Sequence, residues 1–237
     1  MKNIQLRKVD WPMIGMGDKR PEVPAESYAN HARALREAMT MSGLDCLLIY
    51  GDREHYGNFK YVVGFEPRFE EGLIAFFRDP AHGDAVLLGN ECLNLYKSSE
   101  IPIRGILCQS MSLPGQPMDH FISMADSLIE AGVRKGMRVG LAGWKLLHKA
   151  HGNDYEHMFC APSYIVDACR ELVGNDSLIN ATGIFIDPAN GVRLINDVHE
   201  IASMEYGASL ASEGVMNIWK HLKPDMRESD AADYLVT

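Results

Sequence analysis

The sequence predicts an α/β fold in which helices flank a mixed central β-sheet, and three observations lead to this prediction. Stretches with helical periodicity alternate with short apolar runs through most of the 237 residues. This alternation is typical of helices that cover the faces of a sheet. Two of the short runs, 73–77 and 85–88, flank a loop that contains Pro80 and Gly83, which is the pattern of an antiparallel hairpin. The hairpin makes the predicted sheet mixed instead of wholly parallel.

The first elements are a helix and a buried strand. Apolar residues recur at helical spacing from Ala25 to Met41, and Gly43 stands where a helix cap is expected. The run 45–50 is mainly apolar and is closed by Gly51, which indicates a strand buried on both faces. Beyond the hairpin, the expected elements alternate in type. They are a strand at 105–109, a helix at 121–129, a strand at 138–144, a helix at 162–173 and a strand region at 177–186.

The C-terminal part reads as the opening of a further domain. A long helix is expected from Asn196 to His221, because apolar residues recur there at spacings of three and four. The turn 223–230 leads into a second helix, so packing partners are expected beyond Thr237. Turn residues at 187–191 separate these helices from the α/β pattern. We therefore expect three regions, namely an extended arm at 1–23, an α/β domain at 24–190 and an incomplete second domain at 191–237.

Composition and charge argue against several classes of function. The formal net charge is -9 and no Lys/Arg run occurs, whereas a nucleic-acid or anionic-membrane surface needs a basic patch. No run approaches the roughly 18 apolar residues of a membrane span, and the N-terminus lacks the apolar core of a secretory signal. The five cysteines are odd in number and widely spaced, which suits reduced thiols. These features predict a cytoplasmic protein with neither nucleic acid nor membrane as its partner.

One group of side chains has the composition of a metal site. Two histidines three residues apart can share a helix face, and a third beyond a turn would complete a zinc site. The turn at 152–154 interrupts the segment, however, and the spacing matches no established zinc signature. A solvated polar loop is therefore favoured over a structural metal, and the role of the group stays open. Its members are His148, His151, Asp154, Glu156, His157 and Cys160.

The loop 64–72 is the best candidate for a binding element. It concentrates aromatic residues, an arginine and three carboxylates between two strand candidates. Arg68 is suited to bidentate recognition of a carboxylate, and Phe65 or Phe69 is able to wall a small apolar pocket. The alternative is a surface loop in which Arg68 pairs with its own acidic residues at 70–71.

In the segments 28–39, 43–49, 61–65, 191–204 and 222–228, the sequence resembles the creatinase/prolidase family, also called the pita-bread metallopeptidases. The resemblance follows the order of the family along nearly the whole chain, although Asp225 stands where the family commonly has glycine. Of these segments, 61–65 carries the Tyr-x-x-Gly-Phe strand, 191–204 is interdomain-like and 222–228 is a turn.

The resemblance implies an N-terminal α/β domain, with a sheet of the ribonuclease H type, ahead of a catalytic domain. In the family that second domain binds two divalent metals (Mn, Co or Zn) through two aspartates, a histidine and two glutamates, and it cleaves Xaa-Pro bonds. Creatinase relatives hydrolyse a C–N bond without metals. These residues come later in the family than Thr237, so no metal ligand and no catalytic residue is assigned here. The chain is expected to be inactive alone.

The resemblance also implies a homodimer, in which the N-terminal domain reaches the active site of the partner subunit. In creatinase-like members an aromatic residue and an arginine after the Tyr-x-x-Gly-Phe strand help to hold the substrate carboxylate. Arg68, with Phe65 or Phe69, falls at that place. The implied role is dimerisation and substrate gating for a proline-containing peptide or a small guanidino substrate. Dipeptidase, aminopeptidase and creatinase-type activities stay open, and so does a stand-alone protein- or peptide-binding module.

Overall fold

The computed structural model describes residues 7–8 and 19–235, and contacts divide the chain into two compact units. One unit is Ala25–Ile195 and the other comprises the remaining residues. Most of the expected arm at 1–23 lies outside the described residues.

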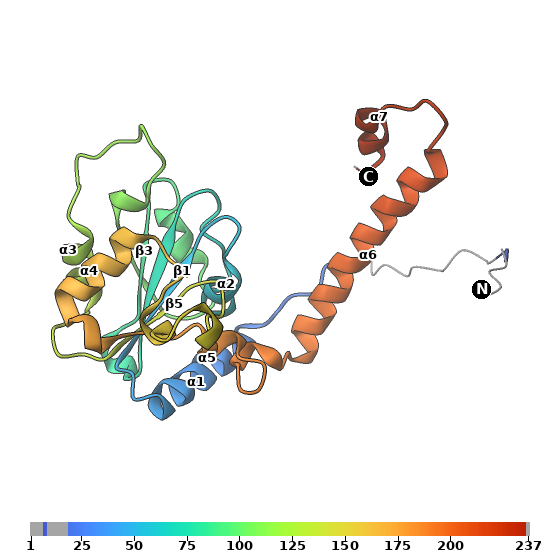
Figure 1. Cartoon of the computed structure of the whole chain (residues 1–237). Helices are drawn as coiled ribbons and strands as arrows, with labels where there is room; N and C mark the ends of the chain where they lie inside the picture. The colour runs from blue at the N-terminus through green and yellow to red at the C-terminus, as the bar shows by residue number, and fades with distance from the viewer. Residues whose placement is uncertain (1–6, 9–18, 236–237) are drawn as a thin grey trace. The chain divides into compact units, whose positions relative to one another are not determined.

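The larger unit is built on a six-stranded sheet with the order β4-β3-β2-β1-β5-β6 (Figure 1). Strands β1 and β3 each pair with β2 in antiparallel fashion, and the other neighbours pair in parallel. Strand β2 therefore runs against the other five, and the predicted mixed sheet is confirmed. The strands are β1 Cys46–Gly51, β2 Gly72–Phe77, β3 Ala85–Leu88, β4 Arg104–Leu107, β5 Val139–Ala142 and β6 Leu178–Asn180.

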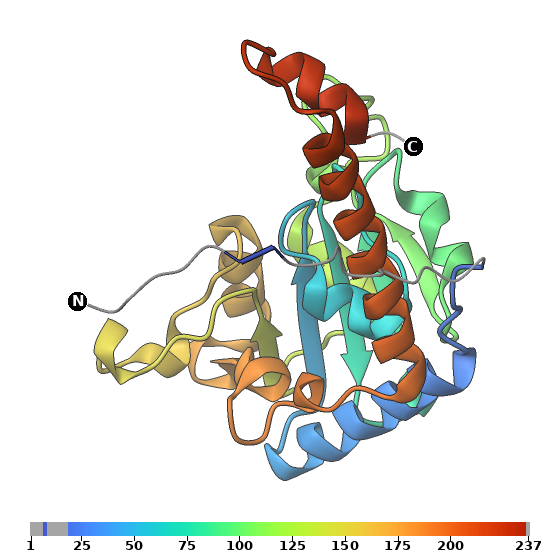
Figure 2. The same ribbon diagram turned by 90° about the vertical axis from the view of Figure 1, so that its right-hand side faces the viewer.

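Helices cover both faces of this sheet (Figures 1 and 2). Along β1, Leu48 and Tyr50 pack into the core beneath α3 and α4, whereas Leu47 and Ile49 pack into the core beneath α1, α2 and α5. All six residues of β1 are buried, which explains its continuous apolar run. The helices are α1 Ala25–Met41, α2 Gly57–Val63, α3 Met124–Ala131, α4 Ser163–Val173 and α5 Gly183–Ile186.

Two local expectations were wrong. The Tyr-x-x-Gly-Phe segment is not a strand, because residues up to Val63 form α2 and Gly64 caps it with a φ of 81°. The expected strand region at 177–186 ends at Asn180, whose side chain accepts a hydrogen bond from the Thr182 N–H at 3.0 Å and turns the chain. Short helix α5 follows and buries Phe185 in the core. In both places tertiary burial overrides the short-range pattern.

The second unit contains α6 Val198–His221 and α7 Glu228–Ala232. A capping box between Asp197 and Glu200 begins α6, and His221 stacks on Tyr234 near its end. Much of the apolar surface of α6 is exposed, at Val198, Ile201, Met204, Leu210, Val215 and Trp219. Among the described residues, none of the helices has the length and hydropathy that crossing a bilayer requires.

Candidate functional site

The candidate site lies along one edge of the sheet, where five strands end and β2 begins. Strands β1 and β3 end at Gly51 and Leu88, and both of these residues pair with Gly72 at the start of β2. Because β4, β5 and β6 run parallel to β3 or β1, they end at the same edge. We call this the carboxyl edge. In open α/β sheets, ligands usually bind outside the carboxyl ends of the strands.

The loop between α2 and β2 places Arg68 at this edge. Residues Pro67 to Glu70 form a tight turn, here called the Arg68 turn, which is closed by the Glu70 N–H donating to the Pro67 carbonyl at 3.2 Å. Arg68 has a φ of 55°, in the left-handed region that residues other than glycine seldom adopt. Its guanidinium carbon lies 5.6 Å from the ring centre of Phe69, which is 40% exposed. The turn thus presents a cation and an aromatic ring together.

A single residue after β3 holds both ends of the Arg68 turn. The Cys92 thiol donates to the Pro67 carbonyl at 3.0 Å, and the Cys92 N–H donates to Oε2 of Glu70 at 2.9 Å. Burial, followed by the hydrogen bond and charge of Glu70, raises the pKa of Cys92 to about 12, so the thiol keeps the proton that it donates. Strained backbone persists where the surroundings over-determine it. Cys92 and the buried Glu70 supply that constraint here.

The three residues expected to contact substrate fall into two groups. Arg68 and Phe69 are exposed at the carboxyl edge, whereas Phe65 lies in the core with its ring 5.5 Å from Phe59 in an edge-to-face contact. In the described part of the chain Arg68 forms no ion pair with either neighbouring acid. Glu70 binds Cys92, and Glu71 is bonded elsewhere. The guanidinium therefore contacts Phe69 of its own loop but pairs with neither of the loop's acids at 70–71.

Glu71 is held by two tyrosines that the sequence alone did not single out. Its Oε1 lies 2.7 Å from the Tyr50 hydroxyl, and its Oε2 lies 2.7 Å from the Tyr164 hydroxyl. Burial, then the hydrogen bond and charge of Glu71, raises the pKa of both tyrosines well above the usual value. Both hydroxyls therefore stay protonated and donate to the carboxylate. This network ties β1 and the start of α4 to the base of the loop that carries Arg68.

A second polar group joins the ends of the parallel strands β1 and β5. Asp52 accepts hydrogen bonds from the backbone N–H groups of Glu54 and His55, and its carboxylate lies 3.0 Å from His55 Nδ1. The His55 ring stacks on Trp144, with ring centres 4.4 Å apart. Burial alone would raise the pKa of Asp52, but these hydrogen bonds and His55 outweigh it and lower the pKa. A sequence signal existed, since Asp52 and Trp144 follow strands almost directly.

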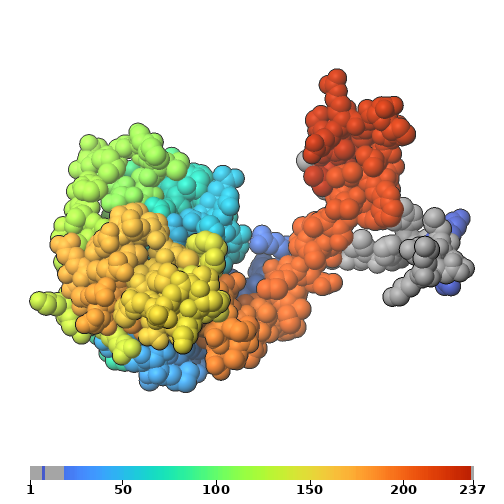
Figure 3. Space-filling model, in the orientation of Figure 1, coloured from blue at the N-terminus to red at the C-terminus, as the bar shows by residue number. Residues whose placement is uncertain are grey.

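The histidine-rich segment forms a separate surface beside α4 (Figure 3). A cavity of about 430 Å³ there is lined partly by His148, Lys149 and Glu156. His157 Nδ1 lies 2.7 Å from Asp154, and the His148 and His151 rings meet edge to face at 4.4 Å. Within residues 7–8 and 19–235, no group of three or more His, Cys, Asp or Glu side chains is arranged to hold a metal ion. We assign this segment no role in chemistry.

Comparison with known proteins finds similar folds among solved structures only. No family model matches the sequence, and no curated protein matches it. Among solved structures, a Xaa-Pro dipeptidase from Bacillus anthracis is similar with a TM-score of 0.54 and 15% identity over 88% of this chain. A prolidase from Pyrococcus horikoshii has a TM-score of 0.55 and 16% identity over 87%, and one from Pyrococcus furiosus has 0.53 and 15% over 84%.

The match covers 47%, 47% and 46% of those three chains, so this chain spans about half of their length. At these identities the likeness is one of fold. The mixed sheet, the helices on both faces and these neighbours together confirm the resemblance that the sequence suggested: the chain has the α/β fold of the creatinase/prolidase N-terminal domain.

Proposed function

We propose that this chain is the N-terminal, non-catalytic part of a Xaa-Pro dipeptidase- or aminopeptidase-like, or creatinase-like, hydrolase. Its role is dimerisation and substrate gating in a cytoplasmic homodimer. The similar solved structures are a Xaa-Pro dipeptidase and two prolidases, which supports this class. On this proposal residues 191–237 open the catalytic domain, which carries out the hydrolysis and, if the whole protein is a peptidase, holds two divalent metals.

The observation that carries the proposal is the Arg68 turn. Arg68 is exposed at the edge where α/β sheets bind ligands, stands beside Phe69, and has a strained backbone conformation fixed by Cys92 and Glu70. A guanidinium that is free of its own acids is suited to the carboxylate of a peptide or of a small guanidino substrate. Phe69 supplies apolar contact, and Phe65 anchors the loop in the core.

The exposed apolar surface of α6 supports the second part of the proposal. Side chains such as Ile201, Met204 and Val215 lie on a helix whose apolar residues are largely exposed. Burying that surface against the rest of a catalytic domain would remove apolar area from water, which stabilises a folded protein. The same surface also suits the alternative function, a stand-alone protein- or peptide-binding module.

The test is steady-state kinetics in the longer protein that includes the catalytic domain. Arg68→Ala is expected to raise the KM for a Xaa-Pro dipeptide about tenfold or more, because a charge-assisted hydrogen bond contributes about 1.5–3 kcal/mol. The matched control is Arg33→Ala, which removes an exposed arginine on α1. An equal KM for the two variants would refute the assignment of Arg68. Binding of proline peptides without any metal-dependent cleavage would favour the binding module.

A further inference from the structure

A second candidate binding place, here called the α1 groove, lies at the opposite edge of the sheet from Arg68. It is a cavity of about 360 Å³ between α1, the loop that joins β2 to β3, and residues 100–102. Since β2 ends and β3 begins beside it, the groove is at the edge where the parallel strands start. Its volume is at the lower end of the range for small-molecule pockets, about 300–1,000 Å³.

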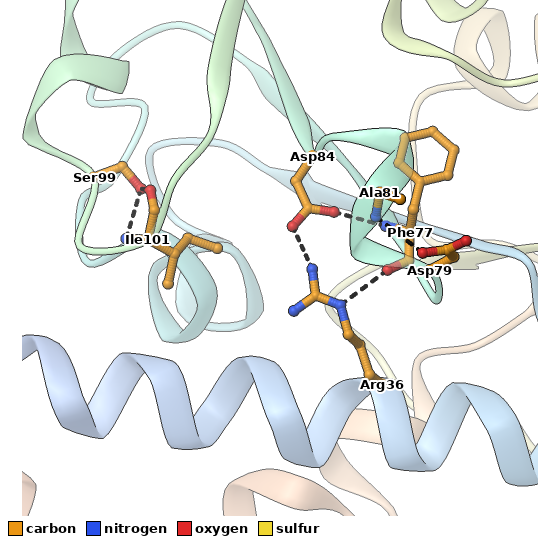
Figure 4. Close-up of polar contacts among 7 residues, drawn as sticks. All are labelled: Arg36, Phe77, Asp79, Ala81, Asp84, Ser99 and Ile101. Carbon is orange, nitrogen blue, oxygen red and sulfur yellow. Dashed lines mark hydrogen bonds and ion pairs between the residues drawn. The ribbon is translucent and has the colours of Figure 1, made fainter.

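Side-chain hydrogen bonds fix both loops that wall the groove (Figure 4). The Asp79 carboxylate accepts from the Ala81 N–H at 2.9 Å and caps the short 3₁₀ helix Pro80–His82. On the other wall, the Ser99 hydroxyl donates to the Ile101 carbonyl at 2.9 Å and accepts from the Ile101 N–H at 3.3 Å. The groove is therefore preformed, which lowers the entropy cost of binding.

Arg36 lines the groove, and two of its three guanidinium nitrogens donate hydrogen bonds within the protein. Its Nε donates to the Phe77 carbonyl at 3.1 Å, and its Nη2 donates to Oδ2 of Asp84 at 2.6 Å. The other oxygen of Asp84 accepts from the Phe77 N–H at 2.8 Å, so both carboxylate oxygens are engaged. Nη1 has no partner in the described part of the chain, and in Figure 4 it points to the side of Arg36 on which Ile101 lies. One charged donor is left for a ligand.

The groove also contains one carboxylate that is free to bind a cation. Glu100 is exposed and lines the groove, and its carboxylate has no partner among the described residues. The remaining lining is largely aliphatic or small, and it includes Ala29, Ala32, Ile101 and Pro102. Because Arg36 is neutralised by Asp84, a simple anion gains little attraction here and is repelled by Glu100.

We propose that the α1 groove binds a small zwitterion, an α-amino acid or short peptide with an aliphatic body. Its carboxylate accepts from Nη1 of Arg36, its ammonium group pairs with Glu100, and its aliphatic part lies against Ala29 and Ile101. This ligand matches the free donor of Arg36, the free carboxylate of Glu100 and the apolar walls. The α1 groove contains no residue of the Arg68 turn. Failure of one proposal therefore leaves the other unaffected.

Titration calorimetry on this chain tests the proposal with L-valine and with alanyl-L-valine, which separate the free amino acid from the peptide. At least one of them is expected to bind saturably. Valinamide lacks the carboxylate and N-acetylvaline lacks the ammonium group, so both are expected to bind at least about tenfold more weakly. Equal binding of either analogue, or the absence of saturation for both ligands by about 10 mM, would overturn the proposal.

Two variants test where the ligand binds. Arg36 itself is left unchanged, because it also supports the fold. Glu100→Gln is expected to weaken binding about tenfold, and Ala29→Leu is expected to block the groove, since Ala29 is exposed on α1. Glu37→Gln removes an exposed carboxylate of α1 that does not line the groove, and it is the matched control. The proposal fails if Glu100→Gln and Ala29→Leu both bind as tightly as Glu37→Gln.

Discussion

Arg36 and Arg68 stand at opposite edges of the same sheet, and their surroundings differ in kind. Arg36 donates to Asp84 and to the Phe77 carbonyl, and its guanidinium carbon lies 4.2 Å from the ring centre of Phe76. Among the residues that the structure describes, Arg68 has no ion pair with the acids of its own loop, and its guanidinium lies beside the exposed ring of Phe69. The first arginine mainly supports the fold, with one donor left over. The second is held in a strained conformation and is free to bind a ligand.

This contrast predicts opposite responses to mutation. At the Arg36 edge, loss of Asp84 leaves the partly buried Arg36 charge without its acid and costs folding free energy. At the Arg68 edge, the backbone strain opposes folding, so relief of the strain is expected to stabilise the chain.

The largest expected effect is on the Arg36 side. Asp84→Ala removes a carboxylate whose side chain is 6% exposed, and it leaves the Arg36 guanidinium and the Phe77 N–H without that acceptor. We expect the free energy of unfolding to fall by about 3–5 kcal/mol, as measured by urea denaturation. The control Asp79→Ala removes the cap of a short 3₁₀ helix and an exposed ion pair with His82, and it should cost about 1 kcal/mol. A loss below about 1 kcal/mol for Asp84→Ala would contradict the structural role of the pair.

An intermediate effect is expected from the tyrosine network next to the Arg68 loop. The pKa of Tyr50 and of Tyr164 is raised in the folded chain, so above about pH 10 the unfolded chain loses protons that the folded chain keeps. Stability that is fully present below that pH is then lost as the pH rises, by about 1.4 kcal/mol per pH unit for each tyrosine. Urea denaturation between pH 8 and pH 11 should show this slope, and Tyr164→Phe should reduce it. If Tyr164→Phe leaves the pH dependence of the free energy of unfolding unchanged, Tyr164 ionises equally in the folded and unfolded chain, and the prediction is wrong.

The smallest expected effect has the opposite sign. Arg68→Gly relieves the cost of the positive φ and should raise the free energy of unfolding by up to about 1 kcal/mol. Arg68→Ala keeps that cost and should change stability by less than about 0.5 kcal/mol. The two variants are compared by urea denaturation at neutral pH. If Arg68→Gly is no more stable than Arg68→Ala, Cys92 and Glu70 do not hold the turn under strain.

The sequence predicted the elements whose patterns are local, and it missed an element that depends on packing. The buried run of β1 and the hairpin of β2 and β3 have patterns set by burial and local turns, and both were predicted. Helix α2 was missed because only seven residues carry its pattern, and its apolar face is defined by packing on the sheet.

The candidate site was predicted only in part. The composition of loop 64–72 indicated Arg68 and Phe69, but it did not show that Phe65 belongs to the core. The groups that hold the loop come from distant segments, since Cys92 follows β3 and Tyr164 lies in the first turn of α4. Such contacts depend on strand order and register, which leave no local signal. Arg36 and Asp84 are likewise brought together by the fold, across 48 positions of sequence.

The most direct test of the proposed function, in which Arg68 of one subunit would serve the active site of the other, uses mixed dimers of the longer protein. One subunit carries Arg68→Ala with an intact catalytic domain, and the other keeps Arg68 but has its metal-binding residues replaced. The measured quantity is the KM of the mixed dimer for a Xaa-Pro dipeptide. We expect a KM close to that of the unmodified enzyme, since Arg68 of the inactive subunit reaches the intact site. A KM as high as that of the Arg68→Ala homodimer would contradict the proposal.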